Sequence, residues 1–239
     1  MPIKVALVTA SSAGLGAATV KALAPHFRVV VNYNSRREKA EQVIREASAI
    51  TKPSDDRGEI EGLVSETVAV MGRLDVVVSN AGWTRMTNFF NIDEQVIEED
   101  WDRCFEVNVK SHLWLLYTAQ KYLEKSENGG CFVTVASIAG VRPSGSSLAY
   151  SVTKAAEIQL TKCLAIICGT KIRCNSVSPG MMLTEWGNKF PESNIKAAAD
   201  RSTLKSLPTP EDVAELIRTL VLNKSITGQN VVVDCGNVI

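Results

Sequence analysis

The chain has 239 residues, of which 45% are hydrophobic, and its 26 basic and 26 acidic side chains give a formal net charge of zero. This length fits one large α/β domain with a full core, and the neutral balance argues against a nucleic-acid or charged membrane partner. No apolar run approaches the roughly 20 residues of a membrane-spanning helix, and the N-terminus lacks the layout of a signal peptide.

The cysteines and histidines exclude other classes. Six cysteines are scattered without a Cys-x-x-Cys pair, which favours free thiols in a reducing compartment, and we expect a cytoplasmic protein. With only His26 and His112 available, we expect no metal site and no Ser-His-Asp triad.

The first elements have the pattern of a nucleotide site. Residues 4–8 form a continuous apolar run, which is typical of a buried parallel strand. The turn T-A-S-S-A-G-L-G follows at residues 9–16, and a helical pattern then continues to about residue 24, before Pro25. Glycines let a backbone approach a phosphate, and the helix N-terminus offers unpaired N–H groups. The order of strand, turn and helix predicts a dinucleotide site.

The second strand, residues 28–31, indicates which dinucleotide binds. An acidic residue near this strand end holds the ribose of NAD, whereas an arginine accommodates the 2′-phosphate of NADP. Here Arg36 and Arg37 precede the first carboxylate, Glu38, so we expect NADP(H) to be favoured over NAD(H). The alternative is that both arginines merely begin a helix, where the helix dipole disfavours positive charge.

The region of the third strand is unusually short. A helix is expected over residues 35–47, and of residues 48–58 only Ala49 and Ile50 have strand character. A helix over 60–71 and a buried strand over 74–79 follow, and then the turn N-A-G at residues 80–82. Such a small-residue turn suits close passage of a cofactor, but it would serve equally as an ordinary turn.

Two side chains in the next elements are candidate site residues. Residues 96–123 have a helical period interrupted by Asn108, which is either a solvent-facing residue or an amide placed for a purpose. Ser137 follows a strand-like run at 131–136. It is therefore expected at the carboxyl end of a strand, where open α/β sheets bind ligands.

Tyr150 and Lys154 lie four apart at the start of the next helical pattern, so they share one helix face. A phenol is a slow acid or base at neutral pH, and a neighbouring ammonium lowers its pKa. Alone, this spacing occurs by chance in many helices, so the assignment depends on other motifs.

The remainder completes an alternating pattern. A strand is expected over 171–177, a substrate-binding loop over 181–205, a helix over 210–222 and a last strand over 230–234. Alternation of strands and helices without a linker predicts one α/β domain over residues 1–239. Its doubly wound parallel sheet would have about seven strands and helices on both faces.

Over its whole length the chain resembles the short-chain dehydrogenase/reductase family, in its branch of 3-oxoacyl-reductase-like carbonyl reductases with a single Rossmann domain. The glycine turn matches residues 9–16, and the Asn-Asn-Ala-Gly motif matches 79–82. The closing motifs match 227–229 and 234–236.

The resemblance assigns roles by position. The family's catalytic set falls on Asn108, Ser137, Tyr150 and Lys154, with Tyr150 as general acid/base, Lys154 on the nicotinamide ribose and Asn108 holding a relay water. Thr184 takes the place that contacts the nicotinamide carboxamide. The implied cofactor site comprises Thr9, Ser11, Ser12, Gly14, Leu15, Gly16, Asn34, Ser35, Arg36, Asn80, Ala81, Gly82, Tyr150, Lys154, Pro179, Gly180, Met182 and Thr184.

Three departures from the family pattern bear on function. Ala10 replaces the first glycine of the turn, and Cys235 stands where a glycine is usual near a terminus that often meets another subunit in relatives. The segment before Gly72 is several residues short, and the family's adenine-binding aspartate has only Ala49 or Asp55 as nearest candidates. We therefore expect weaker adenine binding than in relatives.

The leading hypothesis is an NADPH-dependent reductase of a ketone, reversible toward the secondary alcohol. The alternatives are a catalytically weakened nucleotide-binding sensor or partner subunit, and a dehydratase or isomerase on the same scaffold. An apolar or aromatic ketone is suggested by Trp83, Met86, Val141, Met181, Met182, Trp186 and Phe190. Arg85 and Arg142 would instead steer an anionic carrier, although we favour surface positions for both.

The quaternary expectation rests on resemblance. The apolar stripes at residues 101–116 and 155–164 match faces that form tetramers in the family, so a homotetramer, or a homodimer, is expected.

Overall fold

A parallel sheet of seven strands forms the centre of the molecule in the computed structural model, which describes residues 3–47, 50–53 and 57–239. The strand order is β3-β2-β1-β4-β5-β6-β7, and every neighbouring pair is parallel. The strands are β1 (Val5–Val8), β2 (Arg28–Tyr33), β3 (Ile50–Pro53), β4 (Val76–Ser79), β5 (Gly130–Val135), β6 (Ile172–Pro179) and β7 (Asn230–Val233). The predicted doubly wound sheet is confirmed, and its order reverses between β1 and β4, where such sheets bind ligands.

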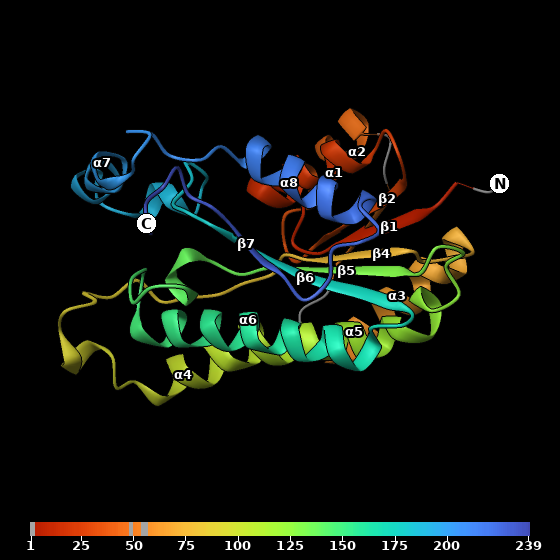
Figure 1. Cartoon of the computed structure of the whole chain (residues 1–239), viewed down its shortest axis with the longest axis horizontal. Coiled ribbons are helices and arrows are strands. Elements are labelled where there is room, and N and C mark those ends of the chain that lie inside the picture. Colours follow the sequence, from red (N-terminus) through yellow and green to blue (C-terminus); the bar gives the residue numbers. More distant parts are fainter. Residues whose placement is uncertain (1–2, 48–49, 54–56) are drawn as a thin grey trace.

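Helices cover both faces of the sheet (Figure 1). One face carries α1 (Gly14–Leu23), α2 (Arg37–Ala47) and α8 (Pro210–Leu222), and the other carries α3 (Arg57–Met71), α4 (Glu98–Phe105), α5 (Ser111–Leu123) and α6 (Leu148–Cys168). The apolar strands β1, β4 and β5 are buried throughout, because a helix layer covers each side of them. Each face has its own hydrophobic cluster.

The helix expected over residues 96–123 is divided into three parts. A π-helical turn, Glu106–Lys110, separates α4 from α5, and Asn108 lies in its middle. π-turns of this kind are frequent at functional sites. The interruption inferred at Asn108 is therefore a change of helical geometry rather than an end of the helix.

Two further segments differ in detail from expectation. The loop expected over 181–205 contains a helix, α7 (Glu192–Arg201), which lies apart from the two main helix layers (Figure 1). The short third-strand region does contain a strand, β3, in parallel register with β2. The candidate adenine residues Ala49 and Asp55 lie outside the described residues.

Among the helices of residues 3–47 and 57–239, none is both long enough and apolar enough to cross a bilayer.

Candidate active site

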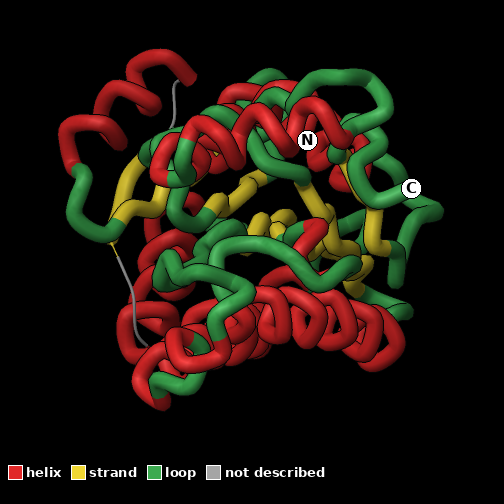
Figure 2. The backbone as a smooth tube through the Cα atoms, turned by 90° about the vertical axis from the view of Figure 1, so that its left-hand side faces the viewer, coloured by secondary structure: helices red, strands yellow, loops and turns green. Residues whose placement is uncertain are grey.

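A cavity of about 1250 Å³ lies at the carboxyl ends of the central strands. Figure 2 views the molecule from this side, where loops gather in front of the strand ends. The cavity brings together most of the predicted site residues. Those that line it are Ser12, Gly14, Leu15, Gly16, Asn34, Ser35, Arg36, Asn80, Gly82, Ser137, Tyr150, Lys154, Pro179, Gly180, Met182 and Thr184.

Three of the remaining predicted residues shape the turns instead of lining the cavity. The Thr9 hydroxyl accepts hydrogen bonds from the N–H groups of Asn80, at 2.8 Å, and Ala81, at 3.2 Å. The buried Ser11 hydroxyl donates to the Val8 carbonyl at 2.7 Å. The Thr9 bonds hold the turn after β1 against the turn after β4, and the Ser11 bond closes the turn after β1 itself.

The turn after β1 fits a dinucleotide phosphate. A Cβ on Gly16 would lie 2.5 Å from the Ala10 carbonyl oxygen and 2.8 Å from the Asn80 amide nitrogen, so only glycine fits there. The first turn of α1 has no acidic residue, and Ala13 at its N-cap gives no side-chain cap. The N–H groups of this helix start are therefore open toward an anion.

Ala10 adopts the left-handed conformation, with φ of +48°. This region costs roughly 1–2 kcal/mol for an L-residue, which explains why the family places a glycine at this position. The same holds at the second departure, where Cys235 has φ of +57°. Both substitutions are therefore accommodated as backbone strain, and neither breaks its turn.

Local capping places Ser137 and Tyr150 on the cavity wall. Ser137 lies two residues after the last residue of β5 and caps a short helical turn, accepting a hydrogen bond from the Ala139 N–H at 3.1 Å. Ser147 caps α6 by accepting from the Tyr150 N–H at 3.1 Å. Lys154 lies one turn further along α6, its Nζ 5.7 Å from the centre of the Tyr150 ring. The predicted Ser, Tyr and Lys thus share one wall.

Burial dominates the acidity of Tyr150. It raises the pKa of the phenol, while Lys154 and the Ser137 hydroxyl act in the opposite direction, and the net pKa lies above its ordinary value. The expected effect of Lys154 is therefore present, but in this structure it does not outweigh desolvation.

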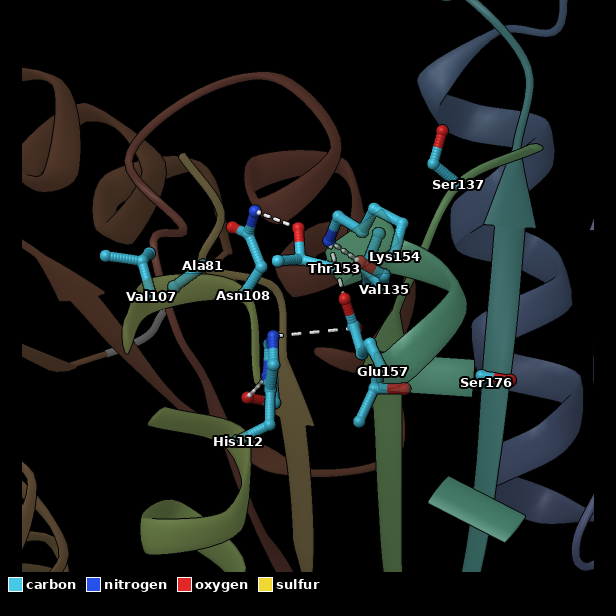
Figure 3. A network of polar contacts seen from close by, with 12 residues as sticks. Ala81, Val107, Asn108, His112, Val135, Ser137, Thr153, Lys154, Glu157 and Ser176 are labelled. Atoms are coloured by element: carbon cyan, nitrogen blue, oxygen red, sulfur yellow. Dashed lines mark hydrogen bonds and ion pairs between the residues drawn. The ribbon is translucent and has the colours of Figure 1, made fainter. Parts of the chain in front are cut away.

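Lys154 has a partner that the sequence pattern did not predict, Glu157. Its Nζ donates to the Val135 carbonyl and to Glu157 Oε2, each at 2.7 Å (Figure 3). Glu157 is fully buried on α6. The available signal was its position three residues after Lys154, which places both side chains on one helix face.

Of the two alternatives for Asn108, the structure supports an amide with specific hydrogen bonds and not a solvent-facing residue. Its Oδ1 accepts from the Trp83 N–H at 2.7 Å, and its Nδ2 donates to the Trp83 carbonyl at 2.9 Å and to Thr153 Oγ1 at 3.0 Å. The side chain is fully buried and does not line the cavity. It ties the segment after Gly82 to α6, next to Lys154 (Figure 3).

Arg36, which also lines the cavity, forms an ion pair that the sequence did not predict. Arg36 and Lys39 both contact the carboxylate of Glu185, which comes from the segment after β6. All three side chains are about half exposed. The residue expected to hold a 2′-phosphate therefore already has an anionic partner.

Five of the seven expected substrate-lining residues reach the cavity, namely Met86, Met181, Met182, Trp186 and Phe190, whereas Trp83 and Val141 do not. The Trp186 ring lies 6.2 Å from the Tyr150 ring. Arg142 lines the cavity but is bonded to the Asn237 carbonyl at 3.2 Å. Arg85 pairs with Asp100.

Known proteins resemble this chain over nearly its whole length. The model of a family described as enoyl-(acyl carrier protein) reductase matches residues 9–237. The 3-oxoacyl-[acyl-carrier-protein] reductase FabG of Thermotoga maritima is 32% identical over 99% of this chain and 98% of its own. The 7alpha-hydroxysteroid dehydrogenase of Bacteroides fragilis is 32% identical over 98% of this chain and 93% of its own.

Solved structures agree with these sequence relatives. A short chain dehydrogenase from Burkholderia cenocepacia, in complex with NADP, superposes with a TM-score of 0.90 at 28% identity over 99% of both chains. The fold, the match at residues 9–237 and the full-length relatives lead to one conclusion. The chain belongs to the short-chain dehydrogenase/reductase family of oxidoreductases.

Proposed function

We propose that this oxidoreductase transfers hydride between NADP(H) and a ketone or secondary alcohol, with Tyr150 as general acid/base. The observation that carries the proposal is the wall formed by Ser137, Tyr150 and Lys154, which faces the same cavity as the glycine turn. Phosphate binding and proton transfer would thus occur in one continuous space.

Each side chain has a distinct task in this scheme. The nicotinamide would supply or accept the hydride. The Ser137 hydroxyl would hydrogen-bond the substrate oxygen, and Tyr150 would give that oxygen its proton. The Lys154 ammonium would favour the phenolate that remains. Asn108 binds the Trp83 backbone and the hydroxyl of Thr153, the residue next to Lys154, and we assign it a supporting role rather than a water site.

The preference for NADP rests on Arg36 and Lys39. In the described structure both contact Glu185, so a 2′-phosphate would replace an exposed carboxylate as their partner. Exposed ion pairs are weak, about 0–1 kcal/mol, so this exchange is favourable for a dianionic phosphate. The Burkholderia cenocepacia dehydrogenase was solved in complex with NADP, which supports NADP as a candidate cofactor, whereas a 7α-hydroxysteroid dehydrogenase of the same fold was solved with NADH.

For the substrate we propose an apolar or aromatic ketone. Met86, Met181, Trp186 and Phe190 give the cavity an apolar wall near Tyr150. Arg142, one of several basic residues that line the cavity, is already engaged by Asn237, so it is less available to an anionic carrier.

A homotetramer in the cytoplasm remains our proposal for the assembled protein. Ile166 and Ile167 of α6 are 85% and 75% exposed, and burial against a second copy would remove this apolar surface from water. Sedimentation of the purified protein tests it, because a monomer at micromolar concentration contradicts self-assembly.

The first experiment is a titration with NADPH and with NADH, followed by quenching of tryptophan fluorescence, and then a ketone panel. Tighter NADPH binding with ketone-dependent NADPH oxidation supports the proposal. NADPH binding without turnover of any ketone or alcohol would favour the sensor. Conversion of substrate without net cofactor use would favour a dehydratase or isomerase.

A further inference from the structure

Behind Lys154, a chain of buried polar groups leads away from the cavity (Figure 3). Glu157 Oε2 accepts from Lys154 Nζ at 2.7 Å, and Glu157 Oε1 lies 3.5 Å from Nε2 of His112 on α5. His112 Nδ1 lies 2.5 Å from the hydroxyl of Ser79, the last residue of β4. Glu157 and His112 are both fully buried. The chain therefore joins α6, α5 and the sheet without reaching solvent through either side chain.

Two atoms of this chain lack a well-formed hydrogen bond. Among the described residues, Glu157 Oε1 and His112 Nε2 have no hydrogen-bond partner although they face each other. Buried polar atoms are nearly always satisfied, so such a facing pair calls for an explanation. A single proton between them would satisfy both, because either atom can accept what the other donates.

The pair has two balanced protonation states. In the first, Glu157 is a carboxylate, His112 carries its proton on Nε2, and Ser79 donates to Nδ1. In the second, one added proton sits on Glu157 Oε1 and is donated to Nε2, while His112 carries its own proton on Nδ1, facing Ser79. His112 stays neutral in both states, and the charge beside Lys154 changes from −1 to 0.

The surrounding groups place this change near neutral pH. Burial raises the pKa of Glu157 to about 7, against the opposing effect of Lys154. Burial lowers the pKa of His112 to about 3 and raises that of Cys104, on α4, to about 11. The pKa values of Lys154 and Tyr150 lie above their ordinary values, and the Thr134 hydroxyl of β5 favours the Glu157 carboxylate.

We propose that Glu157, backed by His112, is a positioning residue for Lys154 that sets the charge of the Tyr150–Lys154 pair by taking up one proton. This inference rests on the proposed function. As a carboxylate, Glu157 holds the ammonium against the Val135 carbonyl and opposes its effect on Tyr150. Once protonated, it leaves the Lys154 charge unopposed, and that charge then favours the phenolate more strongly.

The main test is the substitution Glu157→Gln, which keeps the size of the side chain and an oxygen for Lys154 but cannot ionise. We expect the pH profile of kcat/KM for alcohol oxidation to show two changes. The ionisation near pH 7 disappears, and the limb due to Tyr150 moves to lower pH by about one unit, because a negative charge beside the phenol is removed. A purely structural role for Glu157 would lower activity without moving these ionisations.

The second readout does not need turnover. Infrared spectra of the wild type recorded between pH 5 and 9 should contain a protonated carboxyl band that titrates near pH 7, and Glu157→Gln should lack it. If this band is present and no substrate is found, the charge-setting inference stands and the proposed function fails. If turnover is normal and the band is absent, the inference alone is overturned.

The matched control is Glu215→Gln. Glu215 also pairs with a basic residue three positions away, Arg218, but on the exposed surface of α8. This control should leave both the pH profile and the infrared titration unchanged.

His112→Phe provides an independent variant if Glu157→Gln does not fold. It removes the N–H that stabilises the carboxylate, so the Glu157 titration should move to higher pH. An unchanged titration in His112→Phe, or a wild-type profile without a neutral ionisation, would overturn the proposal.

Discussion

Two buried carboxylates lie at opposite ends of the sheet and differ in how many hydrogen bonds their oxygens accept. Asp75 precedes β4, at the amino ends of the strands, and Glu157 lies near their carboxyl ends. Asp75 accepts hydrogen bonds from the Val5 N–H, from Arg73 through two nitrogens, and from the Ser126 hydroxyl, all within 2.9 Å. Glu157 has one bonded oxygen and one unsatisfied oxygen.

The difference in satisfaction appears in the acidity of the two groups. Burial raises the pKa of Asp75, but the hydrogen bonds from Arg73, Val5 and Ser126 outweigh it, so the pKa falls below its ordinary value. At Glu157 burial prevails and the pKa rises to about 7. A buried carboxylate whose two oxygens both accept hydrogen bonds keeps its negative charge at neutral pH. A buried carboxylate with one oxygen lacking a hydrogen bond gains or loses a proton near neutral pH.

The largest expected effect is at the functional end. Tyr150→Phe should lower turnover by about 10²–10⁴-fold, because the proton donor is lost, while NADPH binding and the folded state persist. Steady-state rates together with the fluorescence titration measure this. The exposed tyrosine of α5 provides the control, Tyr117→Phe, which should retain full activity. Near-normal turnover in Tyr150→Phe would remove the acid/base assignment.

At the structural end, Asp75→Asn should destabilise the protein at pH 7 by about 2 kcal/mol, the usual scale for charged hydrogen bonds. The folded-state pKa of Asp75 lies below its unfolded value, so this stabilisation is present above about pH 4 and is lost as the pH falls further. Urea unfolding of wild type and variant at several pH values measures the difference. A difference that stays constant into the acid range would contradict this role.

Glu157→Gln should have the opposite pH dependence in the same unfolding experiment. The folded-state pKa of Glu157 lies above its unfolded value, so the folded wild type takes up a proton as the pH falls from about 7 toward 4. Wild-type stability relative to the variant should therefore increase over this range. Parallel slopes for Asp75→Asn and Glu157→Gln would show that the two carboxylates do not differ as described.

The strained turn predicts a smaller change. Ala10→Gly should stabilise the fold by up to about 1 kcal/mol, because relief of the left-handed strain exceeds the entropy that glycine adds to the unfolded chain. Ala17→Gly, within α1, should do the reverse. Thermal unfolding of both variants measures this, and destabilisation by Ala10→Gly would mean that the methyl group makes compensating contacts.

The smallest expected effect concerns the exposed ion pairs that Arg36 and Lys39 form with Glu185. Glu185→Gln should tighten NADPH binding about two- to fivefold, since the 2′-phosphate no longer competes with a carboxylate. NADH binding should be unchanged, and the gain should shrink in high salt. Glu192→Gln, on the exposed start of α7, is the control. An equal change in the binding of NADPH and NADH would contradict the proposed competition between Glu185 and the 2′-phosphate.

The sheet and the wall of Ser137, Tyr150 and Lys154 could be predicted because their signals are local. Buried parallel strands appear as apolar runs, and a helix start is marked by its cap. The ends of these elements then placed the three side chains together, as the structure shows.

What the sequence did not show depends on contacts between distant segments or on an unusual residue in a core. Glu185 and Arg36 are 149 residues apart in the sequence, and a local sequence pattern cannot indicate contact between such distant residues. Glu157 lies on the buried face of α6 together with Lys154, whereas a glutamate in an amphipathic helix is normally expected on the solvent-facing side. The mostly polar α7 buries none of its residues, so it carries no apolar period to detect.

The π-turn at Asn108 also bears on how this protein tolerates insertions and deletions. Such a turn holds one residue more than the α-helical turn that it replaces. Deleting one residue between Glu106 and Lys110 would join α4 and α5 into a regular helix and leave the register of α5 against the sheet unchanged. The same deletion would withdraw the Asn108 amide from Trp83 and Thr153. The one additional residue of the π-turn is thus what brings the Asn108 amide to Trp83 and Thr153 without changing the register of the helices on either side.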